Sequence, residues 1–591
     1  MSATALWFGP DERRLFGWVH CHDDGKDRPA VLLCPPLARE LNSATFSYRL
    51  LAEALERKGF LAIRFDYDGT GDSAGSDQDP DRVESWVRSI QSAGDLARQC
   101  GASSVSLVGL RMGGLLADEA ANRMDVEALV LWDPCKEGRS FVRQQQAIQL
   151  LATSDPENSE SAVEIPGFVV DPDTLDDLSG LKLLRSAGAR SLRTLILHRP
   201  DALAILELAE RFSDRGTEAR EITGQSEFLD VEPLNHVVPL ATLDEMTTWL
   251  VQELRPPQVD VPLTRSTIGS PHAVASPSAV VGFAPDGPVI ERVVSLGPLG
   301  LFGIETLPAT PDPERPTLLM MNSGKDSHTG PSRLWVRMAR EWASLGFRSI
   351  RFDFSGLGDS PVRDGQAYQV VRAPEAFDDL SDVVSAQSED PTNVIFVGLC
   401  SGAYQAFESG LELMPRGILA INPLLAFKPP EMETGPIDPR RRICQPPSTT
   451  IRAYRRLLFP RLRRLLEPIA WRAVRLLMPK RSPAKWLNEL IDHEVDVYCV
   501  FGNGEVHQVL EGTKRAMPSL IASGRLHVEV ISKLNHALIA ADQREHVIGL
   551  FSEHLMTKFG PSCPPTTEAR SKDSELDLAG VVMRGRVASP V

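Results

Sequence analysis

The strongest constraint on this chain is that its sequence repeats. "RPAVLLCPPL…RLLAEALERKGFLAIRFDYDGTGDSAG" in the first half matches "RPTLLMMNSG…VRMAREWASLGFRSIRFDFSGLGDSPV" in the second. The shared Arg-Phe-Asp stands at residues 64–66 and 351–353, an offset of 351 − 64 = 287. "VSLVGLRMGG" and "VIFVGLCSGA" match at an offset of 398 − 109 = 289, and "LNHVVP" and "LNHALI" at 536 − 236 = 300. Such near-constant spacing indicates two copies of one fold.

Each copy alternates short Val/Ile/Leu-rich runs with segments of helical periodicity. This pattern is typical of a parallel sheet with helices on both faces. We therefore predict an α/β protein with two tandem domains, each a mostly parallel, doubly wound sheet with a helical lid insert. The predicted domains span residues 1–255 and 288–558, with a Pro- and Ser-rich linker at 256–287 and a disordered tail at 559–591.

Composition excludes several classes of protein. The 591 residues are too many for one hydrophobic core, and the net charge of −16 disfavours binding to nucleic acid. The eight cysteines are scattered with no CxxC pair, which argues for reduced thiols and against a zinc site or a disulfide framework. Because there is no signal peptide and no apolar run of about 18 residues, we expect a cytoplasmic protein. No cofactor and no metal are predicted.

The segment "FVGLCSGAYQA" at 396–406 reads as a strand that turns sharply into a helix. A strand followed by G-x-Nuc-x-G and a helix is a nucleophile elbow, where the residues two before and two after the nucleophile must be small. With Cys400 as the nucleophile these positions are Gly398 and Gly402, whereas Ser401 would place Leu399 at the crowded position. We therefore predict Cys400 as the nucleophile. The alternative is that Cys400 is a small buried hydrophobic residue, as most free cysteines are.

The other members of a triad should follow in the chain order nucleophile, acid, histidine. Glu505 follows a strand in "VDVYCVFGNGEVHQ", and His536 lies in the loop of "VEVISKLNHALI". His536 would take the thiol proton and Glu505 would fix the imidazole tautomer. The alternatives are a surface loop histidine and a solvated loop acid.

Backbone N–H groups should hold the oxyanion that forms in such a reaction. The residue after the nucleophile, Ser401, is one predicted donor. The loop "LLMMNSGKDSHTG" after the first core strand supplies Ser323 or Gly324 as the second.

The first copy keeps the glycines of the elbow but places Arg111 at the nucleophile position. A guanidinium stays protonated and cannot attack a carbonyl. Asp201 and His236 still occupy the acid and histidine positions, so the site reads as a degenerate triad. Two interpretations stay open: Arg111 binds a carboxylate or phosphate, or it pairs with Asp201.

The insert of the second copy is strongly basic. Residues 440–485 hold 14 Arg and Lys and one acid, Glu467, which leaves −16 − 13 = −29 for the rest of the chain. Leucines recur at helical spacing in this segment, so it could lie on an anionic membrane surface or grip an anionic carrier. The alternative is a solvated lid whose leucines cover the pocket.

These residues carry a family resemblance that covers roughly 1–255 and 288–556. Both copies look like α/β-hydrolases of the serine aminopeptidase (S33)-like group. The first copy, with "PPLARELN", "DYDGTGDS" and "GLRMGG", is similar to the exosortase-associated hydrolases found with bacterial exopolysaccharide loci, some of which also have Arg at the elbow. The second, with "DFSGLGDS" and "GLCSGA", resembles a related group with a cysteine elbow, and dienelactone hydrolases are a more distant parallel.

The resemblance implies hydrolase or acyl-transfer chemistry but no particular substrate, because the fold hosts many activities. We expect an esterase, thioesterase or acyltransferase that acts on a small-molecule or carrier-linked acyl group, in exopolysaccharide or lipid-linked metabolism. A different class stays open: a binding or scaffold protein built on two inactive hydrolase folds. A third interpretation is that the first copy stabilises or regulates the second by docking on it.

Overall fold

The computed structural model describes most of both copies. The described residues are 3–22, 26–152, 163–184, 192–213, 216–257, 276–387, 392–423, 483–502, 506, 513, 516–532, 534–536, 538 and 540–560. The basic insert up to residue 482, Glu505 and the tail beyond residue 560 lie outside them.

The first copy forms an eight-stranded sheet in the order β1-β2-β4-β3-β5-β6-β9-β10. β2 pairs antiparallel with β1 and β4, and the remaining strands run parallel. The strands are β1 (Ala3–Phe8), β2 (Leu15–His20), β3 (Pro29–Cys34), β4 (Leu61–Phe65), β5 (Ser104–Leu110), β6 (Ala128–Trp132), β9 (Arg193–His198) and β10 (Thr217–Glu221).

The second copy repeats this order and adds one strand, giving β11-β12-β13-β15-β14-β16-β17-β18-β19. The strands are β11 (Ser278–Ala284), β12 (Gly287–Leu296), β13 (Leu301–Leu307), β14 (Thr317–Met320), β15 (Ser349–Phe352), β16 (Val394–Leu399), β17 (Gly417–Ile421), β18 (Asp496–Gly502) and β19 (Leu526–Ile531). From β12 onward the strand order matches that of the first copy strand by strand. The predicted fold, two mostly parallel doubly wound sheets in tandem, is confirmed.

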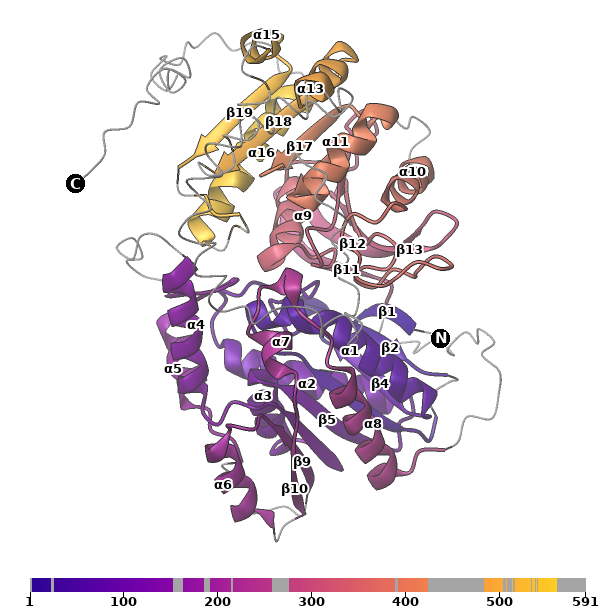
Figure 1. The fold of residues 1–591 in the computed structure, drawn as a ribbon. Coiled ribbons are helices and arrows are strands. Elements are labelled where there is room, and N and C mark those ends of the chain that lie inside the picture. The colour runs from indigo at the N-terminus through magenta and orange to yellow at the C-terminus, as the bar shows by residue number, and fades with distance from the viewer. Residues whose placement is uncertain are drawn as a thin grey trace, which may run out of the picture.

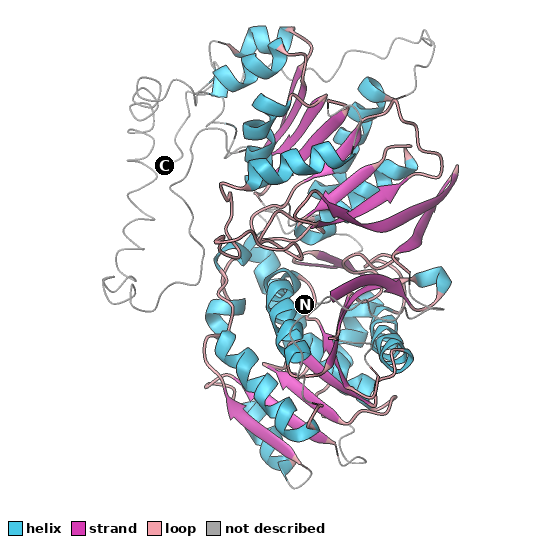
Figure 2. Cartoon of the chain, turned by 90° about the vertical axis from the view of Figure 1, so that its right-hand side faces the viewer, coloured by secondary structure: helices cyan, strands magenta, loops and turns pink. Residues whose placement is uncertain are grey.

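Helices cover both faces of each sheet (Figures 1 and 2). In the first copy α1 and α8 pack on one face, and α2, α3 and α6 pack on the other. In the second, α9 and α16 share one face, and α10, α11, α13 and α15 share the other. The helices are α1 (Arg39–Arg57), α2 (Arg82–Gln99), α3 (Met112–Ala121), α4 (Gly138–Ala152), α5 (Pro172–Gly180), α6 (Leu203–Arg211), α7 (Gln225–Leu229), α8 (Leu240–Leu254), α9 (Leu334–Ser344), α10 (Ala376–Gln387), α11 (Ser401–Leu413), α13 (Pro483–Asp492), α15 (Met517–Ala522) and α16 (Ala541–Phe559).

Two segments differ from the sequence prediction. The predicted linker spans 256–287, but its last part belongs to the fold. β11 (Ser278–Ala284) forms the edge strand of the second sheet. Ser276 and Trp7 of the first copy exchange two backbone hydrogen bonds. The lid insert of the first copy, between β6 and β9, contains α4 and α5 as predicted. It also contains a hairpin of β7 (Val163–Ile165) and β8 (Phe168–Val170). Among the described residues, no helix combines the length and apolar character needed to cross a membrane.

The two copies meet through the antiparallel ends of their sheets, where β1 and β2 lie against β11 to β13 (Figure 1). Their shared apolar cluster includes Trp7 and Phe16 from the first copy and Phe302 and Ile304 from the second, all buried. Burial of these side chains stabilises the junction because apolar surface from both copies leaves water together.

Charged pairs cross this junction reciprocally. Arg351 of the second copy pairs with Asp72 of the first, and Arg64 of the first pairs with Asp359 of the second at 2.7 Å. Arg64 and Arg351 are equivalent residues of the repeat, and so are Asp72 and Asp359, since 359 − 72 = 287. The copies therefore contact each other through the same Arg-Phe-Asp strand and the same glycine-rich loop.

Asp72 lies at the centre of this network. His328 of the second copy approaches its carboxylate through Nε2 at 2.7 Å, and both side chains are almost fully buried. Burial alone would raise the pKa of Asp72, but His328 and Arg351 hold it below its ordinary value. In return Asp72 and Asp353 raise the pKa of His328 well above its ordinary value, against the effect of burial. The pairing therefore keeps a buried carboxylate charged.

We expect Asp72→Asn to destabilise the whole chain strongly. Removing one partner from a buried ion pair leaves the other charge uncompensated, which costs about 3–5 kcal/mol. Urea unfolding of the full-length protein measures the effect. Asp95→Asn, on an exposed pair with Arg98, is the matched control and should change stability by no more than about 0.5 kcal/mol. Equal unfolding midpoints for the two variants would contradict this role of Asp72.

Candidate active site

Both copies contain a sharp strand-to-helix turn at the same place in the sheet. Cys400 lies between β16 and α11 with φ 55° and ψ −107°, and Arg111 lies between β5 and α3 with φ 54° and ψ −117°. A non-glycine residue in this region is strained and persists only when its surroundings enforce it. The same conformation at both positions places Cys400, and not Ser401, at the point of the second elbow.

The glycines around Cys400 have no space for a side chain. A Cβ on Gly398 would lie 2.3 Å from the carbonyl carbon of Gly402, and a Cβ on Gly402 would lie 2.6 Å from the carbonyl oxygen of Asn322. Both obstacles are backbone atoms, which cannot rotate away. The close approach of strand, helix and neighbouring loop thus explains the Gly-x-Cys-x-Gly spacing.

Cys400 is half-buried and its backbone N–H donates to the carbonyl oxygen of Ile421 at the end of β17. Ser401 is the first residue of α11, so its N–H belongs to the turn of the helix that has no intrahelical acceptor. A helix N-terminus carries partial positive charge and favours a thiolate beside it. The position therefore suits a cysteine nucleophile.

The loop after β14 lies against the elbow, but one predicted oxyanion donor is already engaged. The N–H of Gly324 donates to Oγ of Ser401 at 2.7 Å, so Gly324 does not offer this N–H to a substrate in this conformation. Sequence reasoning could not anticipate this bond, because it depends on the Ser401 rotamer. Ser323, also in this loop, is buried beside the elbow and is the remaining predicted donor from this segment.

Asn422, which the sequence analysis did not single out, follows β17 and connects the end of β18 to the loop that holds His536. Its Oδ1 accepts from the N–H of Gly502 at the end of β18, the strand that precedes Glu505. Its Nδ2 lies 3.4 Å from the carbonyl oxygens of Asn535 and His536. The match of "DP" at 133–134 with "NP" at 422–423, which aligns Asn422 with Asp133 at the elbow offset of 422 − 133 = 289, was the available signal.

The structure describes the predicted histidine but not the predicted acid. His536 is an exposed residue in the loop between β19 and α16, at the same carboxyl edge of the sheet as Cys400. Glu505 lies outside the described residues. Because Ile421 binds the elbow and Asn422 binds the His536 loop, two adjacent residues hold both segments at this edge.

Arg372 is a second residue that sequence reasoning missed. Its guanidinium lies over the Tyr404 ring of α11, with Cζ 4.4 Å from the ring centroid. Its Nη1 is buried and has no hydrogen-bond partner within the described part of the chain. Burial lowers the pKa of Arg372, while the neighbouring Cys400 acts in the opposite direction. No periodicity or motif marks this residue, which comes from a loop far from the elbow in sequence.

A small cavity of about 20 Å³ links these groups. Gly324, Arg372, Ser401 and Gln405 line it, together with Ser355, whose Oγ is buried without a hydrogen-bond partner in the described residues. The cavity thus places a guanidinium and a hydroxyl beside the elbow helix.

In the first copy Arg111 is held by carboxylates, but Asp201 is not among them. Arg111 contacts Glu40 at 3.3 Å, Asp133 at 3.8 Å and the Gln144 side chain at 2.9 Å. Burial alone would lower the pKa of Arg111, and Cys135, Glu40 and Asp133 raise it above its ordinary value. The predicted alternative that Arg111 pairs with Asp201 is therefore wrong, because two other acids lie closer.

In the first copy the side chains at the three triad positions do not contact one another in the way that a triad requires. Within the described residues no hydrogen bond or ion pair joins Asp201 to Arg111 or to His236. His236 contacts the carbonyl of Pro233 through Nδ1, its Nε2 is buried without a hydrogen-bond partner, and burial lowers its pKa to about 4. The elbow backbone is retained without the catalytic arrangement.

The first copy instead contacts the loop that borders the Cys400 site. Asn42 donates to Asp326 at 2.9 Å, and Nζ of Lys325 lies 3.3 Å from the carbonyl oxygen of His236. Arg333 donates to the carbonyls of residues 69, 71, 73 and 75 in the glycine-rich loop of the first copy. The loop from 322 to 333 is thus fixed from outside its own domain.

Comparison with known families adds one match. Residues 324–545 match the model of the alpha/beta hydrolase family, which covers most of the second copy. A search of curated proteins found no match. The matched segment and the strand order of both sheets identify the fold as that of α/β-hydrolases.

Solved structures with similar folds include Est1E from Butyrivibrio proteoclasticus, 15% identical, covering 42% of this chain and 99% of that chain with a TM-score of 0.33. Another is XC6422 from Xanthomonas campestris, described as a serine hydrolase without lid. It is 16% identical and covers 44% of this chain and 98% of that chain with a TM-score of 0.28.

We expect Gly402→Ala to destabilise the second copy by about 1–3 kcal/mol, the usual cost of overpacking, because its Cβ would push against the Asn322 carbonyl. The matched control is Gly549→Ala in α16, where a Cβ meets nothing within 4 Å. This change should stabilise the helix by roughly 0.5–1 kcal/mol. Thermal unfolding of both variants measures the difference, and a neutral Gly402→Ala would show that the turn is looser than described.

Proposed function

We propose that the second copy is a cysteine-dependent hydrolase or acyltransferase that acts on an ester or thioester. The observation that carries this proposal is the strained backbone of Cys400 at the N-terminus of α11, enclosed by Gly398 and Gly402. Such backbone strain clusters at functional sites, and in this copy the strained position carries a side chain that can act as a nucleophile.

In the proposed mechanism Cys400 Sγ attacks the acyl carbonyl and His536 accepts the thiol proton. Glu505 would orient the imidazole, as the order of the chain suggests. The N–H groups of Ser401 and Ser323 would stabilise the oxyanion. His536 then returns the proton to the leaving group, and water or an acceptor hydroxyl releases the acyl group from the sulfur.

Arg372 supports a substrate that carries negative charge near the scissile bond. A half-buried guanidinium with a free Nη1 favours a carboxylate or phosphate oxygen, and its planar stacking on Tyr404 fixes its direction. The basic insert, outside the described residues, would suit the same kind of substrate, such as a carrier-linked acyl group. An acceptor in exopolysaccharide or lipid-linked metabolism is the setting that the family resemblance suggests.

The first copy is proposed to be a scaffold without turnover. Arg111 is buried against Glu40 and Asp133 and cannot act as a nucleophile. The contacts of this copy with the loop from 322 to 333 favour a supporting role. The alternative of a binding or scaffold protein on inactive hydrolase folds is thus proposed for the first copy alone.

We expect Cys400→Ala to abolish both the burst and the turnover of p-nitrophenyl esters. Ser401→Ala removes only the acceptor for the Gly324 N–H, a bond worth about 1 kcal/mol, so it should slow turnover several-fold without eliminating the burst. Cys100→Ala, a partly buried cysteine of the first copy, is the control and should match the wild type. A dead Ser401→Ala beside an active Cys400→Ala would overturn the assignment of the nucleophile.

We expect Arg372→Gln to lower kcat/KM for acyl substrates that carry a carboxylate by about tenfold to a hundredfold, the effect of losing one charged hydrogen bond. Neutral esters should be affected much less. Arg416→Gln removes a similar arginine that stacks on Phe559 at 5.3 Å, away from the site, and serves as the control. The same loss of activity for charged and neutral esters would exclude recognition of an anion by Arg372.

A further inference from the structure

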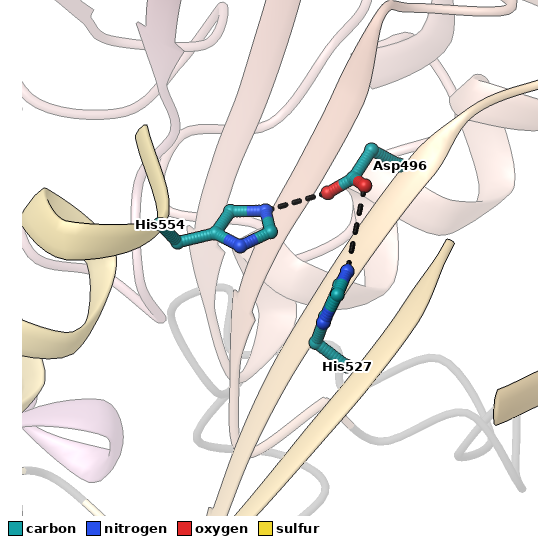
Figure 3. A group of neighbouring side chains, drawn as sticks. All are labelled: Asp496, His527 and His554. Atoms are coloured by element: carbon teal, nitrogen blue, oxygen red, sulfur yellow. Dashed lines mark hydrogen bonds and ion pairs between the residues drawn. The ribbon is translucent and has the colours of Figure 1, made fainter. Parts of the chain in front are cut away.

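Three side chains that could bind a metal converge at the end of the second sheet opposite Cys400. Asp496 begins β18, His527 is the second residue of β19, and His554 lies on α16 (Figure 3). Since β16 to β19 run parallel and Cys400 follows the carboxyl end of β16, this cluster is at the amino edge. It takes no part in the proposed catalytic site.

Both histidines present the same nitrogen to the one carboxylate. Nε2 of His554 lies 2.6 Å from Oδ1 of Asp496, and Nε2 of His527 lies 3.6 Å from Oδ2 (Figure 3). The three ligand atoms all lie within 4.8 Å of one another. Asp496 and His554 are buried, whereas the His527 side chain is 32% exposed although its Nε2 is buried.

His527 has an unsatisfied nitrogen inside this cluster. Its Nε2 is buried and has no hydrogen-bond partner in the described part of the chain, because 3.6 Å to Asp496 is too long for a hydrogen bond. Buried polar atoms of proteins are nearly always satisfied by a partner, a water or an ion. The two imidazole rings and the Tyr498 ring pack together, with centroids 4.7 to 5.8 Å apart, which fixes the direction of both nitrogens.

This set of donors is one that Zn²⁺ accepts. Two imidazole nitrogens and one carboxylate oxygen with an open fourth position suit Zn²⁺, which binds nitrogen at about 2.0–2.1 Å. Ligand atoms around a tetrahedral zinc are therefore roughly 3.3 Å apart, and the observed separations bracket that value. We propose that Asp496, His527 and His554 form a Zn²⁺ site whose fourth position is taken by a water molecule.

Lys558 is the competing cation. Its Nζ lies 3.7 Å from Oδ2 of Asp496 and 3.0 Å from the carbonyl oxygen of Gly524. Its side chain is 35% exposed, so the ammonium can swing away when a divalent cation takes over the charge of the carboxylate. The lysine thus compensates Asp496 without the metal and weakens metal binding by competition.

A metal at this site would restrict the movement of the loop that carries His536. His527 near the start of β19 and His554 near the end of α16 lie on the two elements that the His536 loop connects. A metal bound to both would hold the strand and the helix together and restrict the loop between them. This structural role is independent of whether Cys400 is catalytic.

The test is a Zn²⁺ titration of the full chain, stripped with a chelator, against a chromophoric competitor. All proteins carry Cys400→Ala, so that the thiol contributes no site. We expect one equivalent to bind, the melting temperature to rise with Zn²⁺, and Co²⁺ to give the intense visible absorption of a tetrahedral complex. His527→Gln should lower the affinity at least about a hundredfold, since even an outer-shell change costs 10–100-fold.

His493→Gln is the matched control, because His493 is an exposed histidine of the same domain that bonds to a backbone carbonyl. His527 is partly exposed, so its replacement should leave the fold intact, which circular dichroism verifies. Equal Zn²⁺ affinity of His527→Gln and His493→Gln would overturn the proposal, and so would the absence of a bound equivalent in the parent protein.

Lys558→Met separates a metal site from a simple ion-pair cluster. If the cluster binds Zn²⁺, removal of the competing ammonium should tighten binding and raise the zinc-induced shift of the melting temperature. If the cluster only ties α16 to the sheet by charge, Lys558→Met should lower the melting temperature and leave the response to Zn²⁺ absent. The second result would refute the zinc site.

Discussion

The junction between the copies depends on the buried carboxylate of Asp72, a residue of the first copy that contacts charged side chains of the second. Arg351 and His328 neutralise it, and Glu291 in turn binds Arg351 at 2.7 Å. Separating the copies would break the ion pairs of Asp72 with Arg351 and His328, although these two cations would keep Glu291 and Asp353 as partners within the second copy. The reciprocal pair of Arg64 and Asp359 shows that the junction uses the repeat itself. The two folds are therefore one unit, and their tandem arrangement is a structural requirement.

The first helix of the second copy begins later than its counterpart in the first copy. α1 begins at Arg39, whose counterpart at an offset of 287 is Asp326, but α9 begins only at Leu334. The intervening residues form the loop that borders the Cys400 elbow, and side chains of this loop are held by contacts with the first copy. A loop held from outside its own domain can keep a geometry that its own sequence would not stabilise. The first copy thereby contacts the loop beside the second elbow, although its own elbow carries Arg111.

The sequence predicts the fold well because the determinants of the fold are local or repeated. The two mostly parallel sheets followed from the repeat and from the alternation of strand and helix patterns, and Gly398 and Gly402 indicated the register of the elbow through a steric requirement. The residues that were missed act through long-range contacts: Arg372 reaches Tyr404 from another loop, and β11 forms only by pairing with β12. The bond between the Gly324 N–H and Ser401 was equally hidden, because it depends on a side-chain rotamer.

The difference between the two elbows extends to the end of the next strand. Arg111 and Cys400 share one backbone conformation, so the glycines alone do not determine which chemistry the turn supports. After the neighbouring strand the first copy has Asp133, which pairs with arginine, whereas the second has Asn422, which binds backbone groups of two loops. A carboxylate at that position balances the charge of Arg111, whereas a neutral amide adds no charge beside Cys400 and still organises the loops. The elbow residue and the residue after the next strand therefore differ together. The first copy has the ion pair of Arg111 and Asp133, and the second has Cys400 with the amide of Asn422.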